Sequence, residues 1–210
     1  MDKNKCKVEV EITYDVDPIS SNYTSRYTIF GYGRILVNNK LNYGGLEDMA
    51  EMPRFGTNLI MPANCDHVEW YGRGPHENYW DRKESAFVGI YESSVSDLYF
   101  PYIRPQENGY RTDNRWVKLT NDNGAGLKFV GMPLISFSAH HNLISDFDPG
   151  IKKQQRHTTD IKPRDLISLN IDYKQTGVGG DNSWGARAYE QYQLKPQNYE
   201  YSYLMVPVQD

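Results

Sequence analysis

Cysteine is scarce in this sequence, and long apolar runs are missing. The two cysteines among 210 residues, Cys6 and Cys65, are too few for a disulfide framework, and we expect free thiols. No stretch of about 18 apolar residues occurs, so nothing predicts a membrane span. The charges of the two signs nearly balance, and the net charge is only −4. The sequence therefore predicts neither a nucleic acid nor an anionic membrane surface as a partner.

Helical periodicity is nearly absent as well. Residues 141–147 have a pattern that fits a turn or two of helix before Pro149-Gly150. No signal-peptide core follows the charged first residues, and the compartment stays open between cytoplasm and periplasm. No repeat, linker or low-complexity tract divides the chain, so we expect one domain over residues 1–210.

Aromatic residues are what the chain has in quantity. They make up 13% of it, with 17 Tyr and 4 Trp, although the mean hydropathy is −0.72. Disordered chains are poor in aromatics, so this composition argues against disorder. Tyrosine joins apolar area to a polar tip, which suits half-buried strands and surfaces that contact a sugar or a partner.

Short segments in which apolar and polar residues alternate predict strands along the whole chain. We expect one strand over residues 26–37, with a bulge or bend at Gly31 and Gly33 and a turn at Asn38-Asn39 after it. The other expected strands, with a hairpin turn at 121–124, cover residues 8–14, 68–70, 116–119, 127–130, 134–138, 167–173, 187–194 and 199–206. Many short strands joined by turns predict an all-β sandwich or barrel.

The first polar motif covers residues 67–82 and holds Glu69, Glu77 and Asp81 beside two arginines and two histidines. Glu69 or Glu77 paired with Asp81 would suit acid and base roles in a retaining glycosidase, which needs two carboxyls about 5–5.5 Å apart across the scissile bond. A rigid loop held by Arg–carboxylate pairs and glycine turns is the plainer interpretation, and we favour it.

The second motif, residues 99–116, mixes aromatic and polar side chains, which suits a polar network at an interface or cleft. In one interpretation Gln106, Glu107 and Asn108 bind hydroxyl groups of a ligand. In the other they tie loops to strands. We favour the structural role.

A glycine-rich segment at residues 177–185 carries Trp184. It lacks the GxxxxGK[ST] spacing and no helix pattern follows, so we reject a phosphate-binding loop. Because loops are mostly surface segments and an indole can stack on the C–H face of a sugar, we interpret Trp184 as a binding residue rather than a core residue. Ser183 lacks the GxSxG elbow of a nucleophile.

The five histidines show no metal-binding spacing, and we expect no metal site. His141 and His157 with a carboxylate would form a proton-transfer site if the fold brought them together. We favour histidines that only satisfy structural hydrogen bonds.

Taken together, four motifs resemble the C-terminal domain of the large bacterial β-galactosidases of glycoside hydrolase family 2. They run from about Met52 to the C-terminus in the family's order, whereas the first fifty residues fit only by pattern. The motifs are Met52-Pro53-Arg54-Phe55-Gly56, then Trp70-Tyr71-Gly72-Arg73-Gly74-Pro75 with Glu77-Asn78-Tyr79 and Asp81-Arg82, then Pro105-Gln106-Glu107-Asn108-Gly109 with Arg111, and Gly177-Val178-Gly179-Gly180-Asp181-Asn182-Ser183-Trp184.

The resemblance implies an all-β supersandwich of the galactose-mutarotase-like type. It also implies a parent enzyme whose (β/α)₈ barrel carries both catalytic glutamates and an active-site Mg²⁺. Such a barrel needs about 250 residues of alternating strands and helices, which this chain does not have. We therefore expect no catalytic residue and no cofactor in this chain, and the family leaves open whether the parent is a homo-oligomer.

In the family, the Trp of a Gly-Gly-Asp-Asp-Ser-Trp motif reaches into the active site and stacks on sugar or aglycone. The resemblance therefore implies a substrate-binding role for the matching residues here, which are Asp181, Asn182, Ser183 and Trp184. Asn182 stands where the family more commonly has Asp, which leaves the hydrogen bonding of the loop open.

These observations predict a non-catalytic accessory domain of a β-galactosidase that is inactive alone. Its partners would be the catalytic barrel of the same polypeptide and a β-galactoside whose exact structure stays open. Three alternatives remain: a free-standing enzyme of the mutarotase type, a stand-alone carbohydrate-binding module, and a purely structural interface domain.

Overall fold

The computed structural model describes residues 6–46, 49–148, 156–182 and 184–209. Strands dominate these residues, and no helix among them is long and apolar enough to cross a membrane. The elements in chain order are β1 (Lys7–Val16), η2 (Asp17–Ile19), β2 (Ser21–Phe30), β3 (Ile35–Asn42), β4 (Arg54–Met61), β5 (His67–Gly74), β6 (Phe87–Ser94), α1 (Val95–Leu98), β7 (Arg111–Thr120), β8 (Gly126–His140), α2 (Ile144–Phe147), η3 (Thr158–Asp160), β9 (Ile167–Gln175), η4 (Glu190–Tyr192) and β10 (Tyr199–Val208). The all-β prediction is confirmed.

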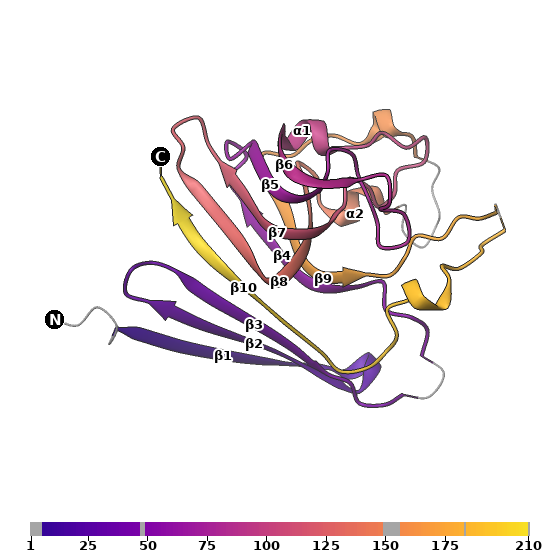
Figure 1. Cartoon of the computed structure of the whole chain (residues 1–210). Coiled ribbons are helices and arrows are strands. Elements are labelled where there is room, and N and C mark those ends of the chain that lie inside the picture. The colour runs from indigo at the N-terminus through magenta and orange to yellow at the C-terminus, as the bar shows by residue number, and fades with distance from the viewer. Residues whose placement is uncertain (1–5, 47–48, 149–155, 183, 210) are drawn as a thin grey trace.

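The long strand β8 is the branch point of the sheet. The strand order is β1-β2-β3-β10-β8-β7-β5-β6, and β9 pairs with both β8 and β4. The first half of β8 pairs with β10, from Gly126 to Met132, and the second half pairs with β9, from Ser136 to His140. Figure 1 shows the result: β1, β2, β3 and β10 form one wing, and the remaining strands curl into a second layer.

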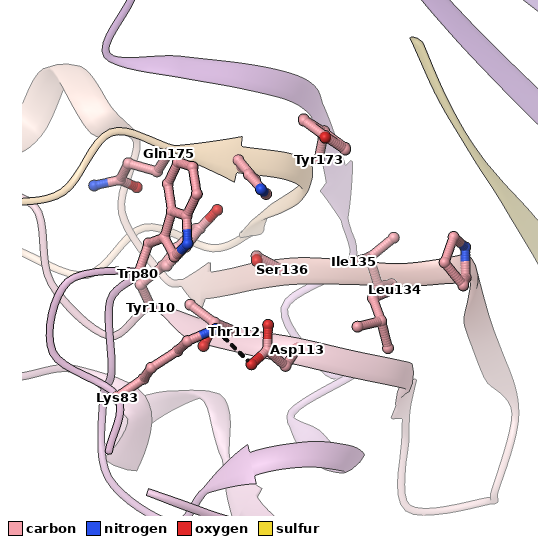
Figure 2. Close-up of a pocket in the computed structure, with 12 residues that line it drawn as sticks. Trp80, Lys83, Tyr110, Thr112, Asp113, Leu134, Ile135, Ser136, Tyr173 and Gln175 are labelled. Atoms are coloured by element: carbon pink, nitrogen blue, oxygen red, sulfur yellow. Dashed lines mark hydrogen bonds and ion pairs between the residues drawn. The ribbon is translucent and has the colours of Figure 1, made fainter. Parts of the chain in front are cut away.

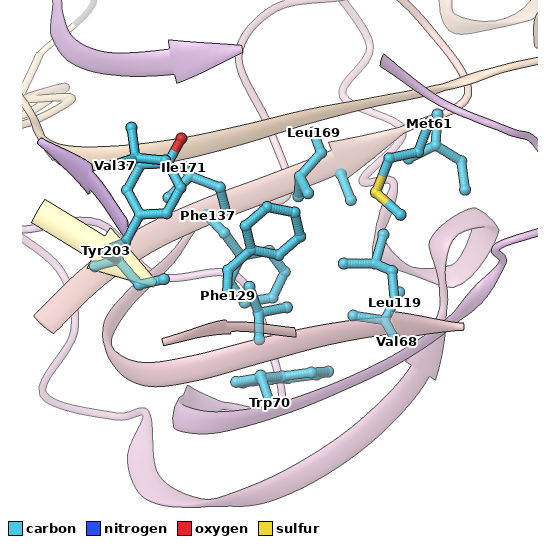
Figure 3. Packing of buried hydrophobic residues seen from close by; sticks show 14 of the residues in the cluster. Val37, Met61, Val68, Trp70, Leu119, Phe129, Phe137, Leu169, Ile171 and Tyr203 are labelled. Carbon is cyan, nitrogen blue, oxygen red and sulfur yellow. The ribbon is translucent and has the colours of Figure 1, made fainter. Parts of the chain in front are cut away.

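Aromatic and branched side chains fill the core between these layers (Figure 3). Trp70, Phe129 and Phe137 are almost fully buried, as are Leu169 and Ile171 of β9. Burying each of these side chains stabilises the fold by about 1.5–3 kcal/mol. The alternation of apolar and polar residues in β9 is what places Leu169 and Ile171 on the core face.

The opposite face of β4, β8 and β9 is polar and yet largely buried. The Asn58 side-chain amide donates to Ser168 Oγ at 2.9 Å and to Asn170 Oδ1 at 3.0 Å. Asn170 in turn donates to Ser138 Oγ at 3.0 Å. The polar face continues to Asp172 and Gln175 of β9, which both contact Arg54 of β4.

Three of the strand predictions are wrong. The pattern predicts two separate strands for residues 127–130 and 134–138, but both lie in the single strand β8. Residues 26–37 form the end of β2, a turn and the start of β3, because Gly33 adopts a φ of +87° and its amide donates to Phe30 O at 2.8 Å. Asn38-Asn39 therefore lies inside β3 and is not a turn. Residues 187–194 contain the 3-10 turn η4 instead of a strand, in part because the Gln193 side chain binds Ala188 O at 2.8 Å.

Candidate functional site

The glycine-rich segment connects β9 to η4 and projects away from the sheet (Figure 1). Trp184 is 92% exposed, so it is not a core residue. Asn182 organises the backbone around it, because its Oδ1 accepts from Trp184 N at 2.8 Å and from Ala186 N at 3.3 Å. Asp181 is exposed, and Ser183 lies outside the described residues. The described loop thus presents an indole to the surroundings on a backbone held by its own side chain.

Asp81 anchors the base of this loop. Its Oδ1 accepts from Val178 N at 3.1 Å and its Oδ2 accepts from Gly179 N at 2.8 Å. The approach requires glycine at position 177, since an added Cβ would lie 2.8 Å from the Asp81 carboxylate and from the Ala188 Cβ. The motif at residues 67–82 and the glycine-rich segment therefore form one structural unit. The sequence does not predict this contact, because 97 and 98 residues separate the partners and no spacing indicates it.

The other acidic residues of the first motif are each held by partners of their own. Glu69 pairs with Lys118 at 2.5 Å. Glu77 accepts from Gly109 N at 2.8 Å and from the Tyr102 hydroxyl. Three carboxylates tied to different neighbours favour the rigid-loop interpretation over an acid–base pair.

Arg73 of the first motif holds the loop that follows β5. Arg73 Nε donates to Asp113 at 2.7 Å, and Arg73 Nη1 donates to the carbonyls of Lys83 and Ala86. The two cations around Asp113, Arg73 and Lys83, outweigh its partial burial and hold the pKa of this carboxyl below its usual value. These contacts fix the loop 80–86 against β7.

The second motif enters a buried ionic cluster around Arg54. Arg54 donates to Glu107 at 2.9 Å and to Gln175 Oε1 at 2.8 Å, and its Nε lies 3.2 Å from Asp172 Oδ2. Burial raises the pKa of Asp172 to about 7, although the charge of Arg54 opposes this shift. Burial likewise raises the pKa of Glu107. Glu107 therefore ties its loop to β4 and β9, which is the structural role we favoured.

His141 and His157 meet different carboxylates. His141 Nε2 lies 3.0 Å from Asp66 Oδ1, and its Nδ1 lies 2.9 Å from Leu166 O. His157 is exposed, and its ring Nδ1 lies 3.7 Å from Asp160. The described contacts therefore join the two histidines to separate parts of the fold. Among the described residues, no group of three or more His, Cys, Asp or Glu side chains could hold a metal ion.

Two solved structures are similar in overall fold. One is a galactose mutarotase related enzyme from Lactobacillus acidophilus, with a TM-score of 0.45, 10% identity, and coverage of 96% of this chain and 67% of that chain. The other is a galactose 1-epimerase from Lactobacillus acidophilus, with a TM-score of 0.40, 10% identity, and coverage of 96% and 63%.

Sequence relatives are closer. A β-galactosidase of Priestia megaterium is 37% identical over 187 residues, which are 89% of this chain and 17% of the relative. One from Vibrio cholerae is 35% identical and covers 84% and 16%, and one from Streptococcus thermophilus is 31% identical and covers 96% and 18%. The chain thus spans about a sixth of the length of these relatives. The family profile described as "Beta galactosidase small chain" matches residues 1–205, and this chain belongs to that family.

Proposed function

We propose that this chain is the accessory part of a β-galactosidase and that it supplies Trp184 as an aromatic contact for the substrate. The parent would be a glycoside hydrolase of family 2, with both catalytic glutamates and Mg²⁺ in the barrel of the same polypeptide. Asp181, Asn182 and Ser183 would shape the substrate-contacting loop. The chain alone would not hydrolyse galactosides, because the paired carboxylates of such a reaction belong to the barrel.

The observation that carries this proposal is the exposure of Trp184 on an anchored loop. An indole that is 92% exposed offers a large apolar face that a ligand ring can cover. Asn182 and Asp81 fix the backbone on both sides of the loop glycines, which lowers the entropy lost when a ligand binds. A sugar ring offers C–H groups to such a face, and its hydroxyls remain free for polar groups of the barrel.

An aromatic platform of this kind contributes about 0.5–1.5 kcal/mol beyond its area burial. In the complete enzyme, Trp184→Ala should therefore raise the KM for a chromogenic β-galactoside by about 2- to 12-fold. Trp184→Phe should keep part of the affinity. Phe87→Ala is the matched control, because Phe87 is 76% exposed on β6 and lies outside the loop.

The second measurement uses the chain alone, in a hydrolysis assay and in a ring-opening assay on α-galactose. We expect no activity in either. Hydrolysis that survives purification would require a carboxylate pair inside these residues and would overturn the proposal. Ring opening alone would support the mutarotase alternative, and an unchanged KM in Trp184→Ala would support the structural-interface alternative.

A further inference from the structure

A pocket of about 280 Å³ opens between β7, β8, β9 and the loop that begins at Trp80 (Figure 2). None of the described residues of the glycine-rich loop lines it. Small-molecule sites have volumes of about 300–1,000 Å³, so this pocket suits an occupant at the small end of that class. Its size fits one monosaccharide-sized ring.

The pocket has walls of two kinds. Pro133 and Leu134 of β8 supply an apolar wall. Thr112 of β7 and Gln175 of β9 are among the groups that supply a polar one. Figure 2 shows Thr112, Leu134 and Gln175 on three neighbouring strands. A pyranose ring has the same division, with C–H groups on its faces and hydroxyls around its edge.

Tyr110 brings a buried polar group to this space. Its side chain is 1% exposed and lines the pocket. The hydroxyl lies near Ser136 and Asp172 but has no partner of hydrogen-bond geometry among the described residues. Burial and the charge of Asp172 raise the pKa of Tyr110, so it stays a neutral hydroxyl that donates and accepts. A buried hydroxyl of this kind is stabilised when a ligand hydroxyl pairs with it.

Lys174 is held at the rim by aromatic rings. Its Nζ lies 3.8 Å from the centroid of Trp80 and 5.3 Å from that of Tyr173. Lys83 lies nearby and binds Asp113 at 2.8 Å. Partial burial lowers the pKa of Lys174, and the charge of Lys83 adds to this effect.

Two of the cations near the pocket already have acidic partners. Arg54, which lies behind the lining, contacts Glu107 and Asp172, and Lys83 pairs with Asp113. Lys174 packs against the ring of Trp80. Cations that are already paired or packed against a ring favour a neutral ligand rich in hydroxyls over an anionic one.

We propose that this pocket binds a single neutral pyranose, at a site separate from the Trp184 loop. The ring would lie against Pro133 and Leu134, and its hydroxyls would meet Tyr110, Ser136 and Gln175. This inference goes beyond the proposed function and does not rest on it, because none of the described residues of the loop lines the pocket.

The test is an NMR titration of the ¹⁵N-labelled chain with D-galactose. We expect saturable shifts at the amides of Thr112, Ser136 and Gln175. Leu134→Trp should fill the pocket and weaken binding at least tenfold. Ile60→Trp is the matched control, since Ile60 is exposed on β4 outside the pocket, and it should change the affinity less than twofold.

Three further measurements complete the test. Ser136→Ala should weaken binding about threefold to tenfold, which keeps the proposal testable if Leu134→Trp does not fold. Trp184→Ala should leave the shifts of the Thr112, Ser136 and Gln175 amides unchanged. The proposal for the Trp184 loop and the proposal for the pocket can therefore be contradicted independently. Absence of saturable binding would contradict the proposal that the pocket binds a pyranose. Binding that is lost in Trp184→Ala and kept in Leu134→Trp would contradict it as well. Tighter binding of D-galacturonate than of D-galactose would overturn the neutral ligand.

Discussion

The amide of Gly179 donates to Asp81 Oδ2 at 2.8 Å, although the two residues are 98 positions apart. Together with the bond from Val178 N, this contact fixes the start of the loop that presents Trp184. The Asp81 carboxylate thus acts at a distance from the indole, as a positioning group for the loop.

Replacing Asp81 should loosen the loop. In Asp81→Ala two amides lose a charged acceptor, and we expect the free energy of unfolding to fall by about 1–2 kcal/mol. Hydrogen exchange at Val178 and Gly179 should accelerate about tenfold or more. Exchange measured by NMR checks this expectation. Asp122→Ala is the control, because Asp122 lies on an exposed hairpin, and protection of the loop amides that persists in Asp81→Ala would contradict the prediction.

Asn182 stands where the resemblance implies Asp, and its contacts predict the effect of exchanging the two residues. Both of its loop hydrogen bonds are accepted by Oδ1, an atom that aspartate also has. We therefore expect Asn182→Asp to keep the exchange protection of the Trp184 amide, and Asn182→Ala to lose it. Equal loss in both variants would show that the amide nitrogen of Asn182 is required.

The buried carboxyl of Asp172 predicts a pH dependence. Burial raises its pKa to about 7 from 3.8, so between about pH 4 and 7 the folded chain keeps a proton that the unfolded chain releases. The contribution of this group to stability is therefore full below about pH 4 and falls as the pH rises towards 7. Asp172→Asn has no such slope. Its unfolding free energy, relative to the unaltered chain, should rise by about 1–3 kcal/mol between pH 4.5 and 7.5. Urea unfolding at both pH values tests this, and parallel profiles would contradict it.

Gly56 of β4 faces the same carboxyl. An added Cβ at this position would overlap with the Asp172 side chain and approach its Cα to 2.8 Å. Gly56→Ala should destabilise the fold by about 1–3 kcal/mol, as overpacking does. Gly180→Ala separates crowding from backbone strain, because nothing lies within 4 Å of its added Cβ although its φ is +93°. Thermal unfolding of both variants measures the difference, and a neutral Gly56→Ala would show that Asp172 can move aside.

The alternation of apolar and polar residues correctly predicted several strands and one turn. The alternation in residues 8–14 and 167–173 became β1 and β9, and the turn at 121–124 joins β7 to β8. The loop setting of Trp184 also predicted its exposure. In β9 the alternation places Leu169 and Ile171 in the core, whereas β1 is exposed along almost its whole length and pairs with the adjacent strand β2.

Long-range contacts could not be predicted from spacing. Asp81 meets the glycine-rich loop, and Arg54 meets Asp172, only because distant strands become neighbours in the sheet. The strand prediction for residues 187–194 was wrong because their aromatic and polar residues alternate as in a strand, whereas their backbone forms the 3-10 turn η4. Tertiary context overrides such short signals.

The position of β10 has a consequence for synthesis on the ribosome. This strand lies between β3 and β8, so among the described strands the wing of β1, β2 and β3 is hydrogen-bonded into the rest of the sheet through residues 199–208. A nascent chain that has emerged as far as β9 holds both halves of the fold without the strand that unites them. Because such distant pairings close slowly, the growing polypeptide must keep the open edges of β3 and β8 from associating with other chains until β10 emerges.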